Sequence, residues 1–226
     1  MAARSALLKS SLAKKYWMSL TGLFLCLFLI VHLAGNLTLL KNPADAGPAF
    51  NAYTEFMTSF PLIKISSYLL YFSILFHAID GILILSRENK KARPVNYAFS
   101  KPDRNSIWAS RNMGVLGTAI FIFIVLHMSN FWFKYKFTDL AMGPGDLPDM
   151  YGVVVSSFQE GWYTAVYVLS MVILGFHLWH GFQSAFQTLG INHHRYSPII
   201  QGAGKVYSVL IPAMFAIIPI YIFLNL

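Results

Sequence analysis

The chain has 226 residues, of which 56% are hydrophobic and only 12% are charged. About a quarter of the residues of a soluble domain are charged, so the composition excludes an ordinary soluble globular protein and indicates an integral membrane protein. The net charge of +8 does not point to nucleic acid, because the basic residues lie between apolar runs. The single cysteine, Cys26, excludes an internal disulfide and an iron–sulfur site built from this chain alone.

Five apolar stretches are long enough to cross a bilayer, which takes about 20 helical residues. In chain order they cover 16–40, 62–86, 112–133, 162–188 and 206–225. The first is too long for the core of a signal peptide, so we expect it to be retained as a helix. Pro212 and Pro219 predict a kink in the fifth. The expected fold is an all-α integral membrane protein with five transmembrane helices in a single domain, 1–226.

The charges of the connecting segments predict the orientation. The N-terminal tail, the loop after the second stretch and the loop after the fourth carry most of the 17 basic residues, whereas the opposite loops are mainly acidic. Basic loops stay on the cytoplasmic side of a membrane. We therefore expect a cytoplasmic N-terminus and a C-terminus on the outer side.

Histidine is the residue that carries chemistry in these apolar stretches. The first four stretches contain one histidine each, at His32, His77, His127 and His177, and His180 follows one helical turn after the last. At ~1.5 Å per residue, His32 and His127 lie nearer the outer ends of their helices, and His77 and His177 nearer the inner ends. The depths therefore predict two pairs, each from two different helices. The remaining two histidines lie in the loop "INHHRYSP" and are expected to be a solvated surface pair.

Paired neutral imidazoles on facing helices are axial ligands for haem iron, and a helical bundle is a common place for such a cofactor. Six-coordinate iron leaves no open position for oxygen and suits electron transfer. Gly81 and Gly181 each follow a histidine by four residues and lie on the same helical face, where a porphyrin could approach the backbone. We therefore expect the first four helices to form a haem-binding bundle with two b haems at two depths.

Two other interpretations of the histidines remain open. Intramembrane histidines can serve as hydrogen-bonding partners between helices. They can also form a zinc site or a proton relay, since ionisable residues inside membranes usually mark function. A zinc site needs three or four ligands at one point, which two separated pairs do not provide.

The segments around the histidines carry a resemblance to a known family. "IVHLAGNL", "FHAIDG", "LHMSNFWF" and "FHLWHGFQSAFQTLG", with the opening "KKYWMSLTGLFL" at 14–25, resemble the dihaem cytochrome b anchor of bacterial succinate:quinone oxidoreductases. These are succinate dehydrogenases or fumarate reductases with a single five-helix membrane subunit. The similarity extends over essentially the whole chain.

The resemblance implies a function, partners and ligands. A flavoprotein subunit would oxidise succinate, an iron–sulfur subunit would relay the electrons, and this chain would pass them through two haems to a quinone, commonly menaquinone. The inner haem would be held by His77 and His177, and the outer haem by His32 and His127. The chain would lie in the bacterial cytoplasmic membrane, without a succinate site of its own and in a complex that can form higher oligomers.

The quinone site is less sharply defined. Some dihaem fumarate reductases carry a quinol-handling glutamate near the outer start of the second helix, and Glu55 is the nearest candidate here; the alternative is a solvated loop acid. They can also carry a glutamate two residues before the fourth-helix ligand, where this chain has Gly175. His180 could contact a haem propionate, hydrogen-bond to a neighbour, or replace His177 as the ligand. The basic loop 87–111 could bind anionic groups or dock the iron–sulfur subunit.

Two other functions compete with this one. The first is the dihaem cytochrome b of another oxidoreductase, such as a hydrogenase, a formate dehydrogenase or a transmembrane ferrireductase. Those proteins more often place two ligands on one helix, whereas here each ligand has a helix of its own. The second is a haem-free transporter or membrane scaffold.

Overall fold

The computed structural model describes residues 11–83 and 107–226, and nearly all of them are helical. It contains five helical spans that are long and apolar enough to cross a membrane. They are α2 (Ser11–Asn36) with the 3-10 turn η1 (Leu37–Leu40), α4 (Pro61–Leu83), α8 (Met113–His127) with the π-helical turn η3 (Met128–Trp132) and α9 (Phe133–Phe137), α11 (Gly161–Thr188), and α12 (Ser197–Asn225). The predicted class, an all-α multi-pass membrane protein with five spans, is confirmed.

The predicted bounds differ from the structure mainly at the fifth span. That helix begins at Ser197 rather than at residue 206, because Pro198 lies in its first turn, where the missing N–H costs nothing. The helix then continues through Pro212 and Pro219, which are both buried. The last residues of the second predicted span, 84–86, lie outside the described residues.

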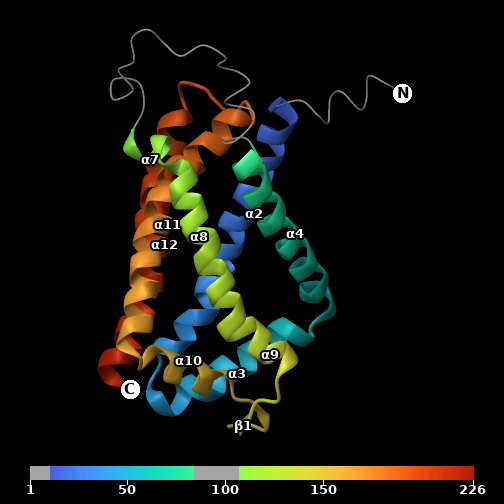
Figure 1. The fold of residues 1–226 in the computed structure, drawn as a ribbon, viewed down its shortest axis with the longest axis vertical. Coiled ribbons are helices and arrows are strands. Elements are labelled where there is room, and N and C mark those ends of the chain that lie inside the picture. The colour runs from blue at the N-terminus through green and yellow to red at the C-terminus, as the bar shows by residue number, and fades with distance from the viewer. Residues whose placement is uncertain (1–10, 84–106) are drawn as a thin grey trace.

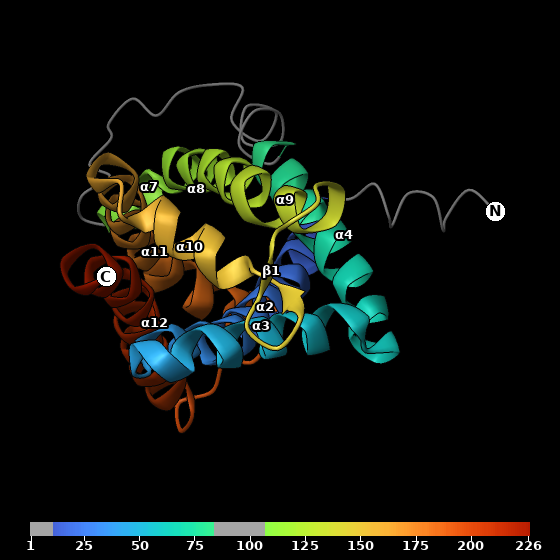
Figure 2. The same ribbon diagram turned by 90° about the horizontal axis from the view of Figure 1, so that it is seen from below.

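Four of the spans form a ring in which each contacts two neighbours. α2 packs against α4 and α11, and α8 packs against the same two helices. The diagonal partners, α2 with α8 and α4 with α11, do not share an extended contact. α12 lies outside this ring against α11 and α2, as Figures 1 and 2 show. The centre of the ring is therefore bounded by four helices that come from distant parts of the chain.

One end of the bundle carries additional structure, which we call the cap. It comprises α3 (Pro43–Ser59), the hairpin β1 (Met142–Gly143) and β2 (Leu147–Pro148), and α10 (Met150–Phe158). The C-terminus lies at the same end (Figure 1). The opposite end carries the start of α2, the end of α4 and the short helix α7 (Trp108–Arg111) that precedes α8. The cap was not predicted, since α3 and α10 are too short to read as spans.

A buried amide holds the two cap helices together. Asn51 on α3 is only 1% exposed. Its Nδ2 donates to Asp149 Oδ1 at 3.0 Å, and its Oδ1 accepts from the Tyr151 N–H at 2.8 Å. Asp149 also caps α10 by accepting from the Gly152 N–H. Both polar ends of Asn51 are thus satisfied, and the register of α3 against α10 is fixed.

Gly35 joins the cap to the first span. A Cβ at this position would collide with the ring of Tyr53 on α3, so only glycine admits that side chain. The Tyr53 hydroxyl donates to the Val31 carbonyl at 3.2 Å. Burial raises the pKa of Tyr53, which keeps this hydroxyl protonated as a donor. The glycine in the motif "IVHLAGN" therefore serves the docking of α3.

Candidate functional site

His32 on α2 and His127 on α8 meet across one diagonal of the ring. Their ring centroids lie 5.8 Å apart, with the ring planes perpendicular. Aromatic rings surround the pair: Phe28 stacks on His32 at 5.1 Å, and Phe131 lies edge-on to His127 at 5.3 Å. Phe215 of α12 also approaches His32, at 5.6 Å. Since α2 ends at Asn36 and α8 ends at His127, this pair lies toward the cap.

His77 on α4 and His177 on α11 meet across the other diagonal. Their ring centroids are 6.2 Å apart and their planes are inclined by 69°. These are the same two pairs that the depths of the histidines along their helices predict, although neither pair of helices is in extended contact. The imidazoles therefore reach toward each other over the centre of the ring.

The positions of two glycines give the distance between the two histidine pairs along the bundle. Gly22 on α2 lies beside the His77–His177 pair, where an added Cβ would be 3.1 Å from His77 Cε1. Gly117 on α8 has the same relation to His177, at 3.8 Å. Each glycine precedes the histidine of its own helix by ten residues, which is ~15 Å of helix. The two pairs are thus stacked about that far apart along the bundle.

Gly22 and Gly117 were not predicted from the sequence as neighbours of the histidines. Their common ten-residue offset from His32 and His127 was visible in the sequence and could have identified them. For Gly81 and Gly181, porphyrin contact stays a prediction, and the protein atoms nearest to their Cβ positions are methionine tips. Their Cβ positions would lie 3.9 Å from Met18 Cε and 3.3 Å from Met113 Cε, respectively.

Hydrogen bonds orient two of the rings. His77 Nδ1 lies 3.3 Å from the hydroxyl of Thr21, which is 8% exposed and donates its own proton to the Trp17 carbonyl. His127 Nδ1 lies 3.2 Å from the hydroxyl of Tyr167. Because the Thr21 proton is donated to Trp17, the Thr21 oxygen can accept from Nδ1–H of His77. In that tautomer a lone pair remains on Nε2, which is the arrangement of a metal-ligating histidine.

The other two rings are held less firmly. The Asn36 amide nitrogen, 3.5 Å from His32 Nδ1, donates chiefly to the His32 carbonyl at 2.8 Å. His177 Nδ1 is buried and has no hydrogen-bond partner. A buried polar atom without a partner is costly, and such atoms often mark functional sites.

The two pairs fit a bis-histidine haem. An imidazole–metal bond is about 2 Å long, so two imidazoles on opposite sides of one ion have centroids about 6 Å apart. The observed separations of 5.8 and 6.2 Å match this spacing. All four histidines are half-buried although they point into the bundle. At the level of His77 and His177, α2 and α8 present Gly22 and Gly117, so neither helix places a side chain there. Within 11–83 and 107–226, no three metal-binding side chains come together as a zinc site would need.

The remaining histidines make other hydrogen bonds and ring contacts. His180 Nε2 lies 3.1 Å from the hydroxyl of Ser184, one turn further along α11. His193 and His194 are exposed in the loop before α12, with their ring centroids 4.3 Å apart and their planes inclined by 39°. Gly175 has a packing role, because a Cβ there would lie 3.1 Å from the backbone oxygen of Ser208 on α12.

Glu55 lies on α3 in the cap and belongs to a hydrogen-bonded cluster. The hydroxyl of Tyr135 on α9 donates to Glu55 Oε2 at 2.9 Å, and the Thr58 hydroxyl lies 3.1 Å from the same tyrosine oxygen. Glu55 is half-buried and its carboxylate is held by a partner from another helix. The carboxylate therefore has a defined position at the cap end.

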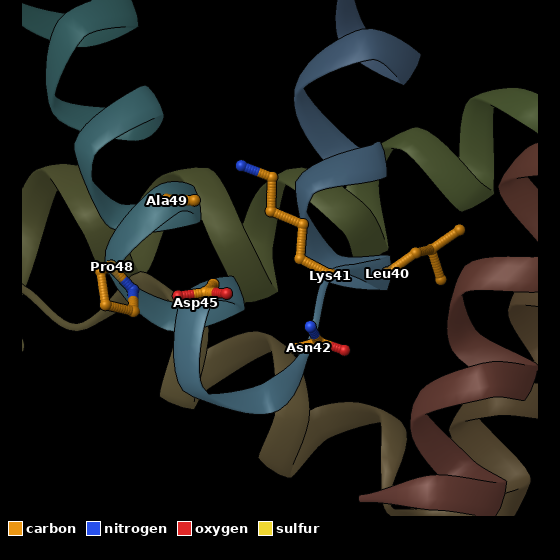
Figure 3. Close-up of a pocket in the computed structure, with 6 residues that line it drawn as sticks. All are labelled: Leu40, Lys41, Asn42, Asp45, Pro48 and Ala49. Carbon is orange, nitrogen blue, oxygen red and sulfur yellow. The ribbon is translucent and has the colours of Figure 1, made fainter.

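A surface pocket also lies at the cap end, where η1 passes into α3. Figure 3 shows the residues that line it: Leu40, Lys41, Asn42, Asp45, Pro48 and Ala49. None of the sequence-predicted site residues contributes to this pocket. Of the basic loop 87–111, positions 87–106 lie outside the described residues, and α7 begins after them.

Comparison of the chain with known protein families, characterised proteins and solved structures returned no match. The fold and the site define a multi-pass helical membrane protein whose four-helix ring brings two histidine pairs together at two levels.

Proposed function

We propose that this chain is the dihaem cytochrome b anchor subunit of a succinate:quinone oxidoreductase, and that it conducts electrons from an iron–sulfur subunit through two b haems to a quinone, with menaquinone the favoured quinone. The observation that carries the proposal is the pairing of four histidines from four helices across the two diagonals of one ring. The resemblance of the histidine segments to that family supplies the identity of the reaction.

The four histidines would hold the two haems, with His77 and His177 at one level and His32 and His127 at the other. Bis-histidine haem iron supplies a one-electron couple without an open coordination position. Thr21 and Tyr167 would keep Nδ1 of their histidines protonated and Nε2 directed at the metal. The ~15 Å between the levels gives two relay points within a hydrocarbon core about 30 Å thick.

Electrons would enter at the end of the bundle opposite the cap. Lys14 and Lys15 at the start of α2 lie at that end, as do Arg111 before α8 and Arg195 before α12. Basic residues favour the cytoplasmic side. On this assignment the iron–sulfur and flavoprotein subunits dock there, on the cytoplasmic face of a bacterial inner membrane, and the cap faces outward.

Protons of the quinone reaction would be handled at the cap. Quinone reduction takes up two protons with two electrons, so it needs a titratable group near the exit of the electron path. Glu55 is held by Tyr135 at the same end of the bundle as the His32–His127 pair. A carboxylate fixed by a tyrosine hydroxyl can exchange a proton in a defined geometry.

The test is purification of the chain from haem-replete cells with whatever co-purifies. The proposal expects a reduced-minus-oxidised spectrum of b type, two haems per chain, and reduction of both by succinate through a flavin-containing partner. A colourless protein would refute it in favour of a transporter or scaffold. Two haems with a hydrogenase or formate dehydrogenase partner would refute the succinate assignment and retain the haem ligands.

A further inference from the structure

The two histidine pairs differ in what surrounds them. The His32–His127 pair is enclosed by aromatic rings, and one of these, Tyr167, presents a hydroxyl to His127 Nδ1 at 3.2 Å. At the other level, His77 Nδ1 has the small Thr21 hydroxyl, and His177 Nδ1 has no partner. The surroundings of the two pairs are therefore chemically unequal.

Tyr167 is held rigidly. It is only 6% exposed, and its ring packs against Phe123 and Phe158 at centroid distances of 4.9 Å each. Its hydroxyl lies 3.0 Å from that of Tyr163, one turn earlier on α11. A phenol placed this way cannot turn from His127 without losing packing on two sides.

The protons of this cluster have a consistent direction. If Nε2 of His127 binds a metal, the ring proton must be on Nδ1, which then donates to the Tyr167 oxygen. The Tyr167 hydroxyl, 3.0 Å from the Tyr163 oxygen, can then donate to that oxygen. This chain of bonds would fix both the tautomer and the rotation of the His127 ring.

We infer that Tyr167 is a positioning residue for His127, which orients this imidazole through Nδ1–H and makes it a more basic ligand than it would be without the hydroxyl. The inference rests on the proposed haem ligation. A hydrogen bond accepted from Nδ1–H increases electron donation to the metal and stabilises its oxidised form. The metal centre at the His32–His127 level therefore has a lower reduction potential than it would without the hydroxyl.

The variant Tyr167→Phe removes the hydroxyl and keeps the ring that packs on Phe123 and Phe158. A matched control is Tyr207→Phe, which removes a hydroxyl that donates from α12 to a backbone carbonyl, that of Cys26 at 2.6 Å, rather than to a histidine. The whole complex is purified in each case, and the haems are followed by potentiometric titration and by the low-spin EPR signals of the iron.

Tyr167→Phe should retain two haems, raise the potential of one component and shift the EPR signal of that component alone, whereas Tyr207→Phe should change neither. Unchanged potentials and signals in Tyr167→Phe would overturn the inference and leave the proposed function intact. An equal shift in both components, or the same shift in Tyr207→Phe, would overturn it as well, because the effect would not be local. A wild-type complex without haem would overturn the proposed function and this inference together.

Discussion

Gly22 of α2 lies directly against the imidazole of His77 on α4, with only 3.1 Å between the position of a Cβ and His77 Cε1. The contact is tighter than a side chain at position 22 would tolerate without moving the ring. Gly117 on α8 faces His177 with more room, since its Cβ position lies at an ordinary contact distance of 3.8 Å from His177 Cε1. The space around His77 and His177 is thus left free of side chains by α2 and α8, which contribute no ligand to that pair.

Replacing Gly22 or Gly117 by leucine should therefore empty one haem site although all four histidines remain. We expect the haem content of Gly117→Leu to fall from two per chain toward one, measured as haem per protein after purification. Gly202→Leu is the control, since no atom lies within 4 Å of its Cβ position. Two haems in both Gly22→Leu and Gly117→Leu would contradict the placement of a porphyrin between these walls.

Removal of the ligands at the inner level gives a second prediction. His77→Ala and His177→Ala should each lose the same haem component, because iron held by one imidazole alone lacks its second axial ligand. Reduction of the remaining haem by dithionite should persist, whereas its reduction by succinate should be slowed at least about tenfold, a change of about 1.4 kcal/mol in the barrier. Normal haem content in either variant would refute the ligand assignment.

The outer level should respond independently. His32→Ala and His127→Ala should remove the other spectral component, and the double variant should lose no more haem than either single one, because the two side chains act as a unit. Difference spectra and haem counts measure this outcome. Loss of both haems in His32→Ala, with a folded chain, would show that the levels are not separate sites.

Asn51 should be a principal determinant of the stability of the cap. Asn51→Leu leaves the Tyr151 N–H without its partner and removes a hydrogen bond to Asp149. Loss of a buried partner costs about 1–3 kcal/mol, so the cap should be cleaved faster by protease and the unfolding temperature in detergent should fall. Asn225→Ala, at the exposed C-terminal end of α12, is the control and should leave both unchanged.

Quinone turnover should depend on the cluster around Glu55. Glu55→Gln keeps the shape but cannot exchange a proton, and Tyr135→Phe removes the hydroxyl that holds the carboxylate. Both variants should lower quinol-linked activity, while dithionite still reduces both haems. If the Glu55 carboxylate transfers the proton, Glu55→Gln should lower the activity by about a hundredfold. Asp45→Asn, in the surface pocket at the same end, should behave as wild type. Full activity in Glu55→Gln would exclude it from the quinone site.

The sequence was sufficient to predict the spans and which histidines come together. The spans follow from the length of the apolar runs, and the depth of each histidine follows from the rise of a helix. His32 could therefore be matched with His127 by depth alone. The haem itself and its redox role remain predictions. The cap was missed because α3 and α10 are held by Asn51 and Asp149, and a single buried amide leaves no pattern in composition.

The surroundings of the histidines could not be predicted for a related reason. Gly22, Thr21 and Tyr167 act on rings that belong to other helices, so their roles depend on how the helices are rotated. Gly81 and Gly181 were selected by their spacing on the ligand helix, which does not reveal the neighbouring side chain. That neighbour is a methionine in each case, and contact with a porphyrin stays a prediction.

The diagonal arrangement has a consequence for how the protein is made. His32 and His127 belong to the first and third spans, so that site can close once three spans have entered the membrane. His77 must wait for His177 on the fourth. Haem loading would then proceed in the order of translation, with the site beside the cap filled first, and a chain stalled before its fourth span would carry a single haem.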